Sequence, residues 1–216
     1  MIDQDFICTD DFEANGIVKW KSPSNIALVK YWGKKDNQIP QNPSISFTLS
    51  KSHTTTSVEF KPKKNNENNI LFDFHDIKNH PFGQKIKLFI SSIDKYFQFL
   101  KNHDLHIKSQ NNFPHSSGIA SSASSMSCLS SCLVDIESLN SKSKDDSYYI
   151  KKKSFIARLG SGSASRSIEG PITLWGSSSS YLGSSDLYAI NISDDVNKVF
   201  HDYQNSILII DPGVKK

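Results

Sequence analysis

The sequence contains few cysteines, and those it has follow no recognisable ligand or disulfide pattern. The three, Cys8, Cys128 and Cys132, are odd in number and lack metal-ligand spacing. Cys128 and Cys132 fall one turn apart on a predicted helix, where small buried thiols are the simplest interpretation. No apolar segment follows a basic stretch at the N-terminus, and no apolar run approaches the roughly 18 residues that a membrane span needs. We therefore expect a soluble, reduced, cytoplasmic protein that does not enter a membrane.

The chain is also short of net charge. Its 25 lysines and arginines stand against 22 aspartates and glutamates, which gives +3 over 216 residues. A balance this small does not indicate nucleic-acid binding. The seven histidines are scattered without metal-ligand spacing. The length fits one large domain, or one domain and the start of a second.

Apolar periodicity predicts strands and helices in an irregular order, which favours an α+β fold over a doubly wound sheet. The clearest helix carries one apolar stripe, formed by Ile86, Ile90, Ile93, Phe97 and Leu100. We expect the segments at 44–49 and 54–60 to form a β-hairpin and 61–69 to form an exposed loop. Further helices are predicted over 119–136 and 147–159, and further strands over 16–22, 25–31, 70–74, 105–109, 172–175, 187–192 and 207–210.

The segment 111–124, Asn-Asn-Phe-Pro-His-Ser-Ser-Gly-Ile-Ala-Ser-Ser-Ala-Ser, is typical of a phosphate-binding turn. A glycine-containing turn that leads into a helix presents successive N–H groups to an anion. Serine hydroxyls at its end can hydrogen-bond phosphate oxygens, and Ser121 or Ser122 is a candidate Mg²⁺ ligand. A serine-rich helix cap that binds nothing is the alternative. The candidate phosphate contacts are Gly118, Ala120, Ser121, Ser122 and Ala123.

A second motif places two lysines around an aromatic pair. Lys30 and Lys34 flank Tyr31-Trp32-Gly33, and Gly33 allows a turn that brings Lys34 back toward the strand. Two cations and a phenol suit a substrate that bears a carboxylate and a diphosphate. The alternative is an edge strand with solvated lysines and a core tryptophan.

The third motif is Gly-Ser-Gly-Ser-Ala-Ser-Arg-Ser at 160–167. A planar guanidinium such as that of Arg166 can hold a carboxylate or phosphate through two parallel hydrogen bonds. The neighbouring serines and their N–H groups can complete an anion site. A flexible linker is the alternative, although Ala164, Arg166 and Ile168 are not typical of linkers.

These three ordered motifs resemble those of the mevalonate diphosphate decarboxylase family, within the GHMP kinase superfamily. The resemblance begins near Val18 and runs to the last residue. Ala120 replaces the second glycine of the superfamily's Gly-Leu-Gly-Ser-Ser core, as in the decarboxylase branch, and Ser165 replaces a cysteine. The resemblance implies a GHMP-kinase N-terminal domain, of the ribosomal protein S5 domain 2-like fold, over residues 1–205. It also implies that 206–216 begin a ferredoxin-like C-terminal domain that is largely missing.

The resemblance assigns roles to single residues. Lys30, Ser163 and Arg166 match catalytic positions. The implied substrate contacts are Asn25, Tyr31, Trp32, Gly33, Lys34, Ser161, Gly162, Ser163, Ala164, Ser165 and Arg166.

The implied reaction converts mevalonate 5-diphosphate and ATP, with Mg²⁺, to isopentenyl diphosphate, ADP, phosphate and CO₂. Complete members of the family are often homodimeric. They use an aspartate in the C-terminal domain, and no segment of this sequence matches the motif around it. We therefore expect the isolated chain to be inactive. Two alternatives stay open: a GHMP-family small-molecule kinase, and a non-catalytic remnant that binds nucleotide.

Overall fold

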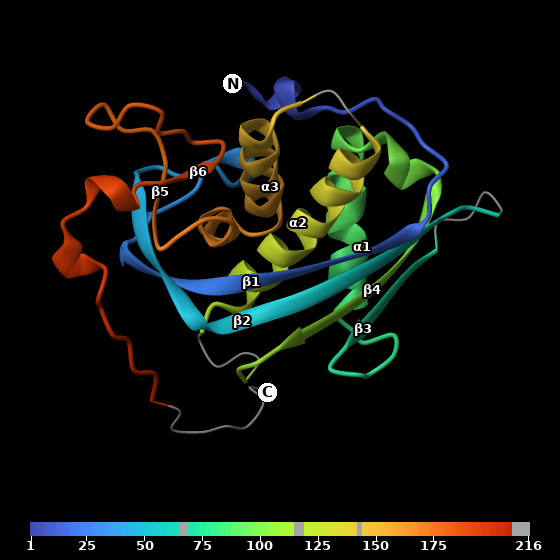
Figure 1. The fold of residues 1–216 in the computed structure, drawn as a ribbon, viewed down its shortest axis with the longest axis horizontal. Coiled ribbons are helices and arrows are strands. Elements are labelled where there is room, and N and C mark those ends of the chain that lie inside the picture. The colour runs from blue at the N-terminus through green and yellow to red at the C-terminus, as the bar shows by residue number, and fades with distance from the viewer. Residues whose placement is uncertain (65–68, 115–118, 142–143, 209–216) are drawn as a thin grey trace.

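The computed structural model describes residues 1–64, 69–114, 119–141 and 144–208. Within them, strands and helices alternate irregularly and build an α+β fold, as the sequence predicted (Figure 1). The strands are β1 (Gly16–Val29), β2 (Ser44–Pro62), β3 (Ile70–Phe74), β4 (His103–Asn111), β5 (Ile172–Trp175) and β6 (Ala189–Asn191). The longer helices are α1 (Gly83–Ser92), α2 (Ser121–Asn140) and α3 (Asp146–Gly160).

The sheet is organised around the long strand β2. Strand β1 runs antiparallel along one side of β2, from Gly16 opposite Phe60 to Val29 opposite Ile45. The other side of β2 pairs with β4 and, further along, with β5. Strand β3 adds to β4 in parallel, and β6 adds to β5, so the sheet is mixed. Figure 1 shows the three helices on one face of this sheet.

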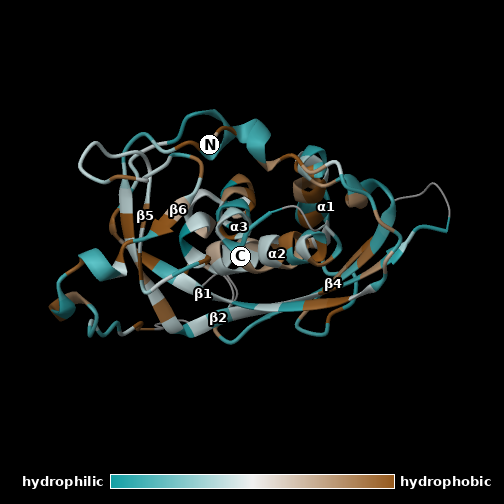
Figure 2. Ribbon diagram, turned by 45° about the horizontal axis from the view of Figure 1, so that its top comes forward, coloured by the Kyte–Doolittle hydropathy of each residue, from teal (hydrophilic) through white to brown (hydrophobic). Residues whose placement is uncertain are grey.

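The core lies between the helices and the sheet. Phe6, from the N-terminal segment, stacks on Phe155 of α3 with ring centroids 4.3 Å apart. Leu133 of α2 and Ile107 of β4 are fully buried between the two layers. Figure 2 shows apolar residues on α1, α2 and β4 in this region. Burial of each large apolar side chain stabilises the fold by about 1.5–3 kcal/mol.

The predicted hairpin at 44–49 and 54–60 is wrong. These residues form the single strand β2, and the polar residues between them stay in the extended conformation. The reason is long-range pairing, because β1 runs alongside on both sides of a register shift at Pro23 and Ser24. The predicted strands at 16–22 and 25–31 likewise merge into β1, which ends at Val29.

The predicted helix through Leu100 is also shorter than expected. Helix α1 ends at Ser92, and 3₁₀ helices follow at Asp94–Tyr96 and Gln98–Lys101. Between these, the backbone of Phe97 is extended because Cys8 pairs with it: the Cys8 N–H donates to Tyr96 O at 3.2 Å. The apolar stripe predicted burial correctly, but the helix ends before the segment that Cys8 contacts.

The strands predicted at 70–74 and 172–175 form with those bounds, as β3 and β5, and other expected elements form with shifted bounds. Helix α2 extends to Asn140, and β6 covers only the middle of the predicted 187–192 strand. Of the predicted strand at 207–210, Ile207 and Leu208 are exposed and not in a strand, and 209–210 lie outside the described residues. None of the described helices has the length and apolar character required to cross a membrane.

Candidate functional site

The start of α2 presents the predicted phosphate-binding turn. Ala120 precedes the helix in the left-handed conformation, with φ 55° and ψ 45°. Ser121 and Ser122 form the first helical turn, whose N–H groups have no partner within a helix and lie at its positive end. Ser122 is exposed and Ser121 half-buried, whereas the Ala123 side chain is fully buried. The predicted contact Gly118 lies outside the described residues.

A buried serine that sequence reasoning missed joins this turn to the sheet. The Ser24 hydroxyl, in β1, donates a hydrogen bond to Ile119 O and lies 3.5 Å from Ala120 O. Ser24 follows Pro23 at a register shift, where residues 50–52 of β2 have no partner in β1. Asn25, the next residue of β1, contacts another segment.

Asn25 binds the serine–arginine motif, which is a buried 3₁₀ helix over Gly162–Ser167. Its amide donates to Ser163 O at 3.0 Å and to Ser167 Oγ at 2.6 Å. Further carbonyls of the motif accept from Ser154 of α3 and from Ser127 of α2, at 2.9 and 3.0 Å. The linker alternative is therefore wrong, since side chains from three elements hold this backbone in place.

Arg166 is the central charge of the site and is 2% exposed. Its guanidinium lies 5.5 Å from the Tyr31 ring and 5.7 Å from the Trp175 ring. Nη1 donates to Ser44 Oγ at 2.8 Å, and Nη2 lies 3.5 Å from Asn25 Oδ1. In the described part of the chain no carboxylate pairs with it, and its buried Nε has no hydrogen-bond partner. Burial lowers the pKa of Arg166 to about 10, so the side chain is still charged at neutral pH.

The serines of the motif divide into two groups. Ser161 and Ser163 are half-buried, and their hydroxyl oxygens lie 3.3 Å apart. The Ser165 hydroxyl instead donates to Gly162 O at 2.8 Å inside the motif, and Ala164 is fully buried. The structure thus leaves Ser161 and Ser163 accessible to a ligand, while the binding roles of Gly162, Ala164 and Ser165 stay predictions.

The first lysine of the basic motif lies beyond the strand that was expected to carry it. The pairing of β1 with β2 stops before Lys30. There the Asn42 side chain donates to Lys30 O at 2.9 Å and accepts from the Trp32 N–H at 2.7 Å. Lys30 is exposed. Trp32 is 81% exposed, so the core tryptophan of the alternative interpretation is wrong.

The second lysine lies close to the arginine motif. Gly33 adopts φ 151°, and its carbonyl accepts from the Gln41 N–H at 3.1 Å, which closes a loop over 33–41. The Lys34 ammonium lies 5.4 Å from the Tyr31 ring and donates to Gln38 Oε1 at 2.5 Å. Since Arg166 contacts the same ring, Tyr31 brings the two cations together.

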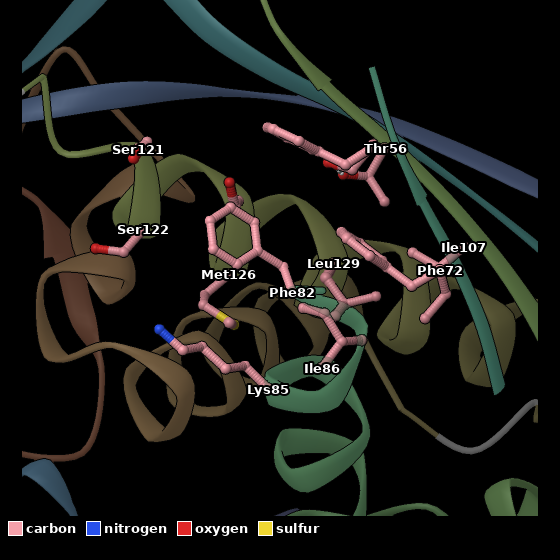
Figure 3. A pocket seen from close by; sticks show the side chains of 13 residues that line it. Thr56, Phe72, Phe82, Lys85, Ile86, Ile107, Ser121, Ser122, Met126 and Leu129 are labelled. Atoms are coloured by element: carbon pink, nitrogen blue, oxygen red, sulfur yellow. Dashed lines mark hydrogen bonds between the residues drawn. The ribbon is translucent and has the colours of Figure 1, made fainter. Parts of the chain in front are cut away.

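A cavity of about 210 Å³ opens between α1, α2 and the sheet. Its walls are mainly apolar and aromatic, and Ser121 and Ser122 lie at one end (Figure 3). The Lys85 side chain extends toward that end. Sequence periodicity could not reveal the cavity, because its walls come from separate elements: Phe72, Phe82, Ile86, Ile107, Met126 and Leu129.

Comparison with known proteins shows which family shares this fold. The model of the diphosphomevalonate decarboxylase-like N-terminal domain matches residues 22–189. The chain belongs to this family. The match includes all three motifs and confirms the resemblance drawn from them. It also confirms the α+β fold expected for the N-terminal domain.

Named relatives agree with this assignment. The diphosphomevalonate decarboxylase of Saccharomyces cerevisiae is 33% identical over 184 residues, which cover 80% of this chain and 44% of the yeast protein. The mevalonate diphosphate decarboxylase of Enterococcus faecalis has 32% identity and a TM-score of 0.66, covering 84% of this chain and 53% of that one. The Staphylococcus aureus enzyme has 33% identity and a TM-score of 0.64, covering 83% and 50%. The chain therefore spans about half the length of the relatives it matches.

Proposed function

We propose that the whole protein converts mevalonate 5-diphosphate and ATP to isopentenyl diphosphate, ADP, phosphate and CO₂. The observation that carries the proposal is Arg166, a buried cation without a carboxylate partner in the described residues. A buried charge of this kind is costly until an anion compensates it. The names of the relatives support the choice of a mevalonate diphosphate as that anion.

In this proposal the substrate bridges the serine–arginine motif and the loop over 33–41, which carries Lys34. Arg166 holds the carboxylate, because its fork matches that group and its Nε is free to donate. Ser161 and Ser163 add hydroxyls beside it. Lys34 contacts the diphosphate, and the Tyr31 ring lies against both cations. Trp32 and Gly33 complete the diphosphate segment, and Asn25 positions the arginine motif.

ATP fits the start of α2 and the adjoining cavity. Its phosphates would lie against the N–H groups of Ser121 and Ser122, where the helix dipole favours negative charge. The aromatic walls of the cavity suit a flat nucleobase, with Lys85 near the phosphates. A related solved structure, 32% identical with a TM-score of 0.66, is MDDEF in complex with MVAPP, AMPPCP and magnesium, which supports the pairing of the two ligands.

Mg²⁺ would be held mainly by the phosphates. No group of three potential acidic, histidine or cysteine ligands occurs in the described residues, and the hydroxyl of Ser121 or Ser122 is the protein ligand that fits. Mg²⁺ commonly binds through phosphates, waters and one or two protein oxygens. Bound there, it would neutralise the charge on the transferred phosphoryl group.

The residues of the site then act by placement and charge. The tertiary hydroxyl of mevalonate 5-diphosphate is a poor leaving group until the γ-phosphoryl of ATP is transferred to it. Lys30 neutralises the charge that moves during this transfer. When phosphate departs, positive charge develops at the adjacent carbon. Arg166 and Ser163 keep the carboxylate in the orientation from which CO₂ leaves.

The test compares Arg166→Lys with Lys64→Ala in the whole protein. Lysine keeps the charge but loses the two parallel hydrogen bonds, so turnover should fall at least tenfold, equivalent to about 1.4 kcal/mol. Lys64 is an exposed lysine outside the site, and its removal should leave turnover unchanged. The assay measures CO₂ and phosphorylated products together. A stable phosphorylated product without CO₂ would identify a kinase, and equal activities would remove Arg166 from the site.

A further inference from the structure

A second buried arginine lies next to the site, and the proposed reaction does not use it. Arg158, in α3, is 0% exposed and packs over the Phe155 ring at 5.0 Å. Its Nε donates to Leu187 O at 2.8 Å, and its Nη1 donates to Asn37 O. The buried Nη2 has no hydrogen-bond partner in the described residues.

Arg158 carries a charge that no carboxylate neutralises at close range. No ion pair within the described residues includes it. Burial lowers its pKa to about 10, against weaker attraction from Asp3 and Asp186, so it is still charged at neutral pH. A fully buried apolar residue would avoid the cost of desolvating a cation. The arginine is therefore better explained by its contacts with other segments than by stability.

Through Asn37, Arg158 contacts the loop over 33–41 at a place where the backbone conformation is unfavourable. Asn37 and Gln38 both have left-handed backbones, with φ of 55° and 61°. Such conformations are unfavourable for residues other than glycine unless the surroundings hold them. The Arg158 guanidinium supplies that hold by binding the carbonyl between the two residues.

From Asn37 the contacts continue to the proposed substrate groups. The next side chain, Gln38, accepts the hydrogen bond from the Lys34 ammonium. A Cβ placed on Gly162 would lie 3.5 Å from Gln38 Oε1, so Gln38 lies against the arginine motif. Arg158 thus reaches Lys34 through two consecutive loop residues.

We propose that Arg158 is a positioning residue for the anionic substrate. It clamps the 33–41 loop against α3, so that Gln38 holds Lys34 near Tyr31 and Arg166. Its uncompensated charge also adds to the positive potential of the site. The clamp stands on the contacts alone, whereas the identity of the anion rests on the proposed function.

Two measurements on the whole protein separate these parts. Hydrogen exchange is followed at the Lys35 and Gln41 amides, which bond within the loop to Ile39 O and Gly33 O. Calorimetry measures binding of mevalonate 5-diphosphate. Arg158→Met should speed exchange of both amides at least tenfold, leave α2 unchanged and weaken binding at least tenfold. Arg158→Lys, which keeps the charge without the fork, should recover part of the affinity but not the loop protection.

The matched control is Lys151→Met, which removes a cation from the same helix without touching the loop. It should change neither measurement. Unchanged exchange in Arg158→Met would overturn the clamp, and faster exchange with unchanged affinity would overturn its role toward the substrate. If the whole wild-type protein binds no mevalonate 5-diphosphate while the exchange difference is present, the proposed function fails and the clamp is supported.

A second variant guards against misfolding of Arg158→Met. Gln38→Gly leaves the core intact, tolerates the positive φ and cuts the contact to Lys34. Binding should weaken severalfold with α2 exchange unchanged. Wild-type affinity in this variant would overturn the link between the loop and the lysine.

Discussion

Ser24 and Ile119 are 95 residues apart in sequence, yet the hydroxyl of one donates to the carbonyl of the other. The next residue along the strand, Asn25, binds the arginine motif through Ser163 and Ser167. Two adjacent side chains of β1 therefore hold the proposed phosphate-binding turn and the proposed carboxylate site in a fixed relation. This arrangement suits a reaction in which a phosphoryl group must pass between two ligands.

Ser24→Ala should weaken nucleotide binding more than it weakens the fold. The change leaves Ile119 O without its buried donor, at a cost of about 1–2 kcal/mol in the free energy of unfolding. Because the turn at Ala120 loses its tether, ADP affinity should fall severalfold. Urea unfolding and calorimetric titration with ADP measure the two effects.

The control for this change is Ser46→Ala. Ser46 is a buried serine of the neighbouring strand β2, and its hydroxyl bonds to Thr173 Oγ1 at 3.2 Å. It should lose a similar amount of stability and keep its ADP affinity. Equal affinity losses in both variants would show that the effect of Ser24 is general destabilisation.

Ala120→Gly should stabilise the protein. Ala120 has a left-handed backbone, which costs about 1–2 kcal/mol for a residue with a Cβ and much less for glycine. We expect the midpoint of thermal unfolding to rise, with a gain of about 1 kcal/mol. Ala123→Gly, three residues further into α2, should instead lose about 1 kcal/mol or more, because it is buried and helical. A loss in both variants would contradict the strain at Ala120.

The candidate site residues that sequence reasoning singled out lie within contiguous motifs. Asn25, Arg166 and Ser121 each belong to a short pattern whose chemistry can be inferred from neighbours in the chain. The structure adds that the motif around Arg166 is buried and that Tyr31 contacts both Arg166 and Lys34.

The residues that it missed act through long-range contacts. Ser24 is one of many serines, and Arg158 looks like an ordinary helix arginine until its partners are known. Helix α1 likewise stops short of Phe97, whose backbone pairs with Cys8 of the N-terminal segment. No local periodicity reports such pairings, so the apolar stripe predicted burial and not the helix end.

Lys152 and Glu137 form a buried ion pair. Removing one partner should destabilise the protein strongly, whereas replacing both with apolar residues should cost little stability. Lys152 is 0% exposed, and its ammonium lies 2.5 Å from Glu137 Oε2 and 3.0 Å from Tyr96 O. Lys152→Met leaves the carboxylate buried alone, so it should cost about 3–5 kcal/mol. Combining it with Glu137→Leu should recover most of that loss, as denaturant unfolding would show.

The adjacent lysine provides the comparison. Lys153 pairs with Asp135 at 2.7 Å in a less buried position. Lys153→Met should cost no more than about 1 kcal/mol. A double variant at 137 and 152 as unstable as Lys152→Met alone would mean that lost packing, not the unpaired charge, dominates.

Glu169 should make the free energy of unfolding depend on pH in a range above the ordinary pKa of a glutamate. Burial raises the pKa of this carboxyl above 4.5, against a smaller opposing effect of a backbone hydrogen bond from Asn191. The unfolded chain therefore loses its proton first as pH rises. The stabilising contribution of the protonated group is complete below about pH 4.5 and is lost as pH rises through the higher pKa of the folded state. Glu169→Gln does not titrate, so it should be more stable than wild type at pH 7, with the difference shrinking toward pH 4. Unfolding in urea at pH 4, 5, 6 and 7 measures that difference, and a gap that stays constant across the series would show that Glu169 is not desolvated in the folded state.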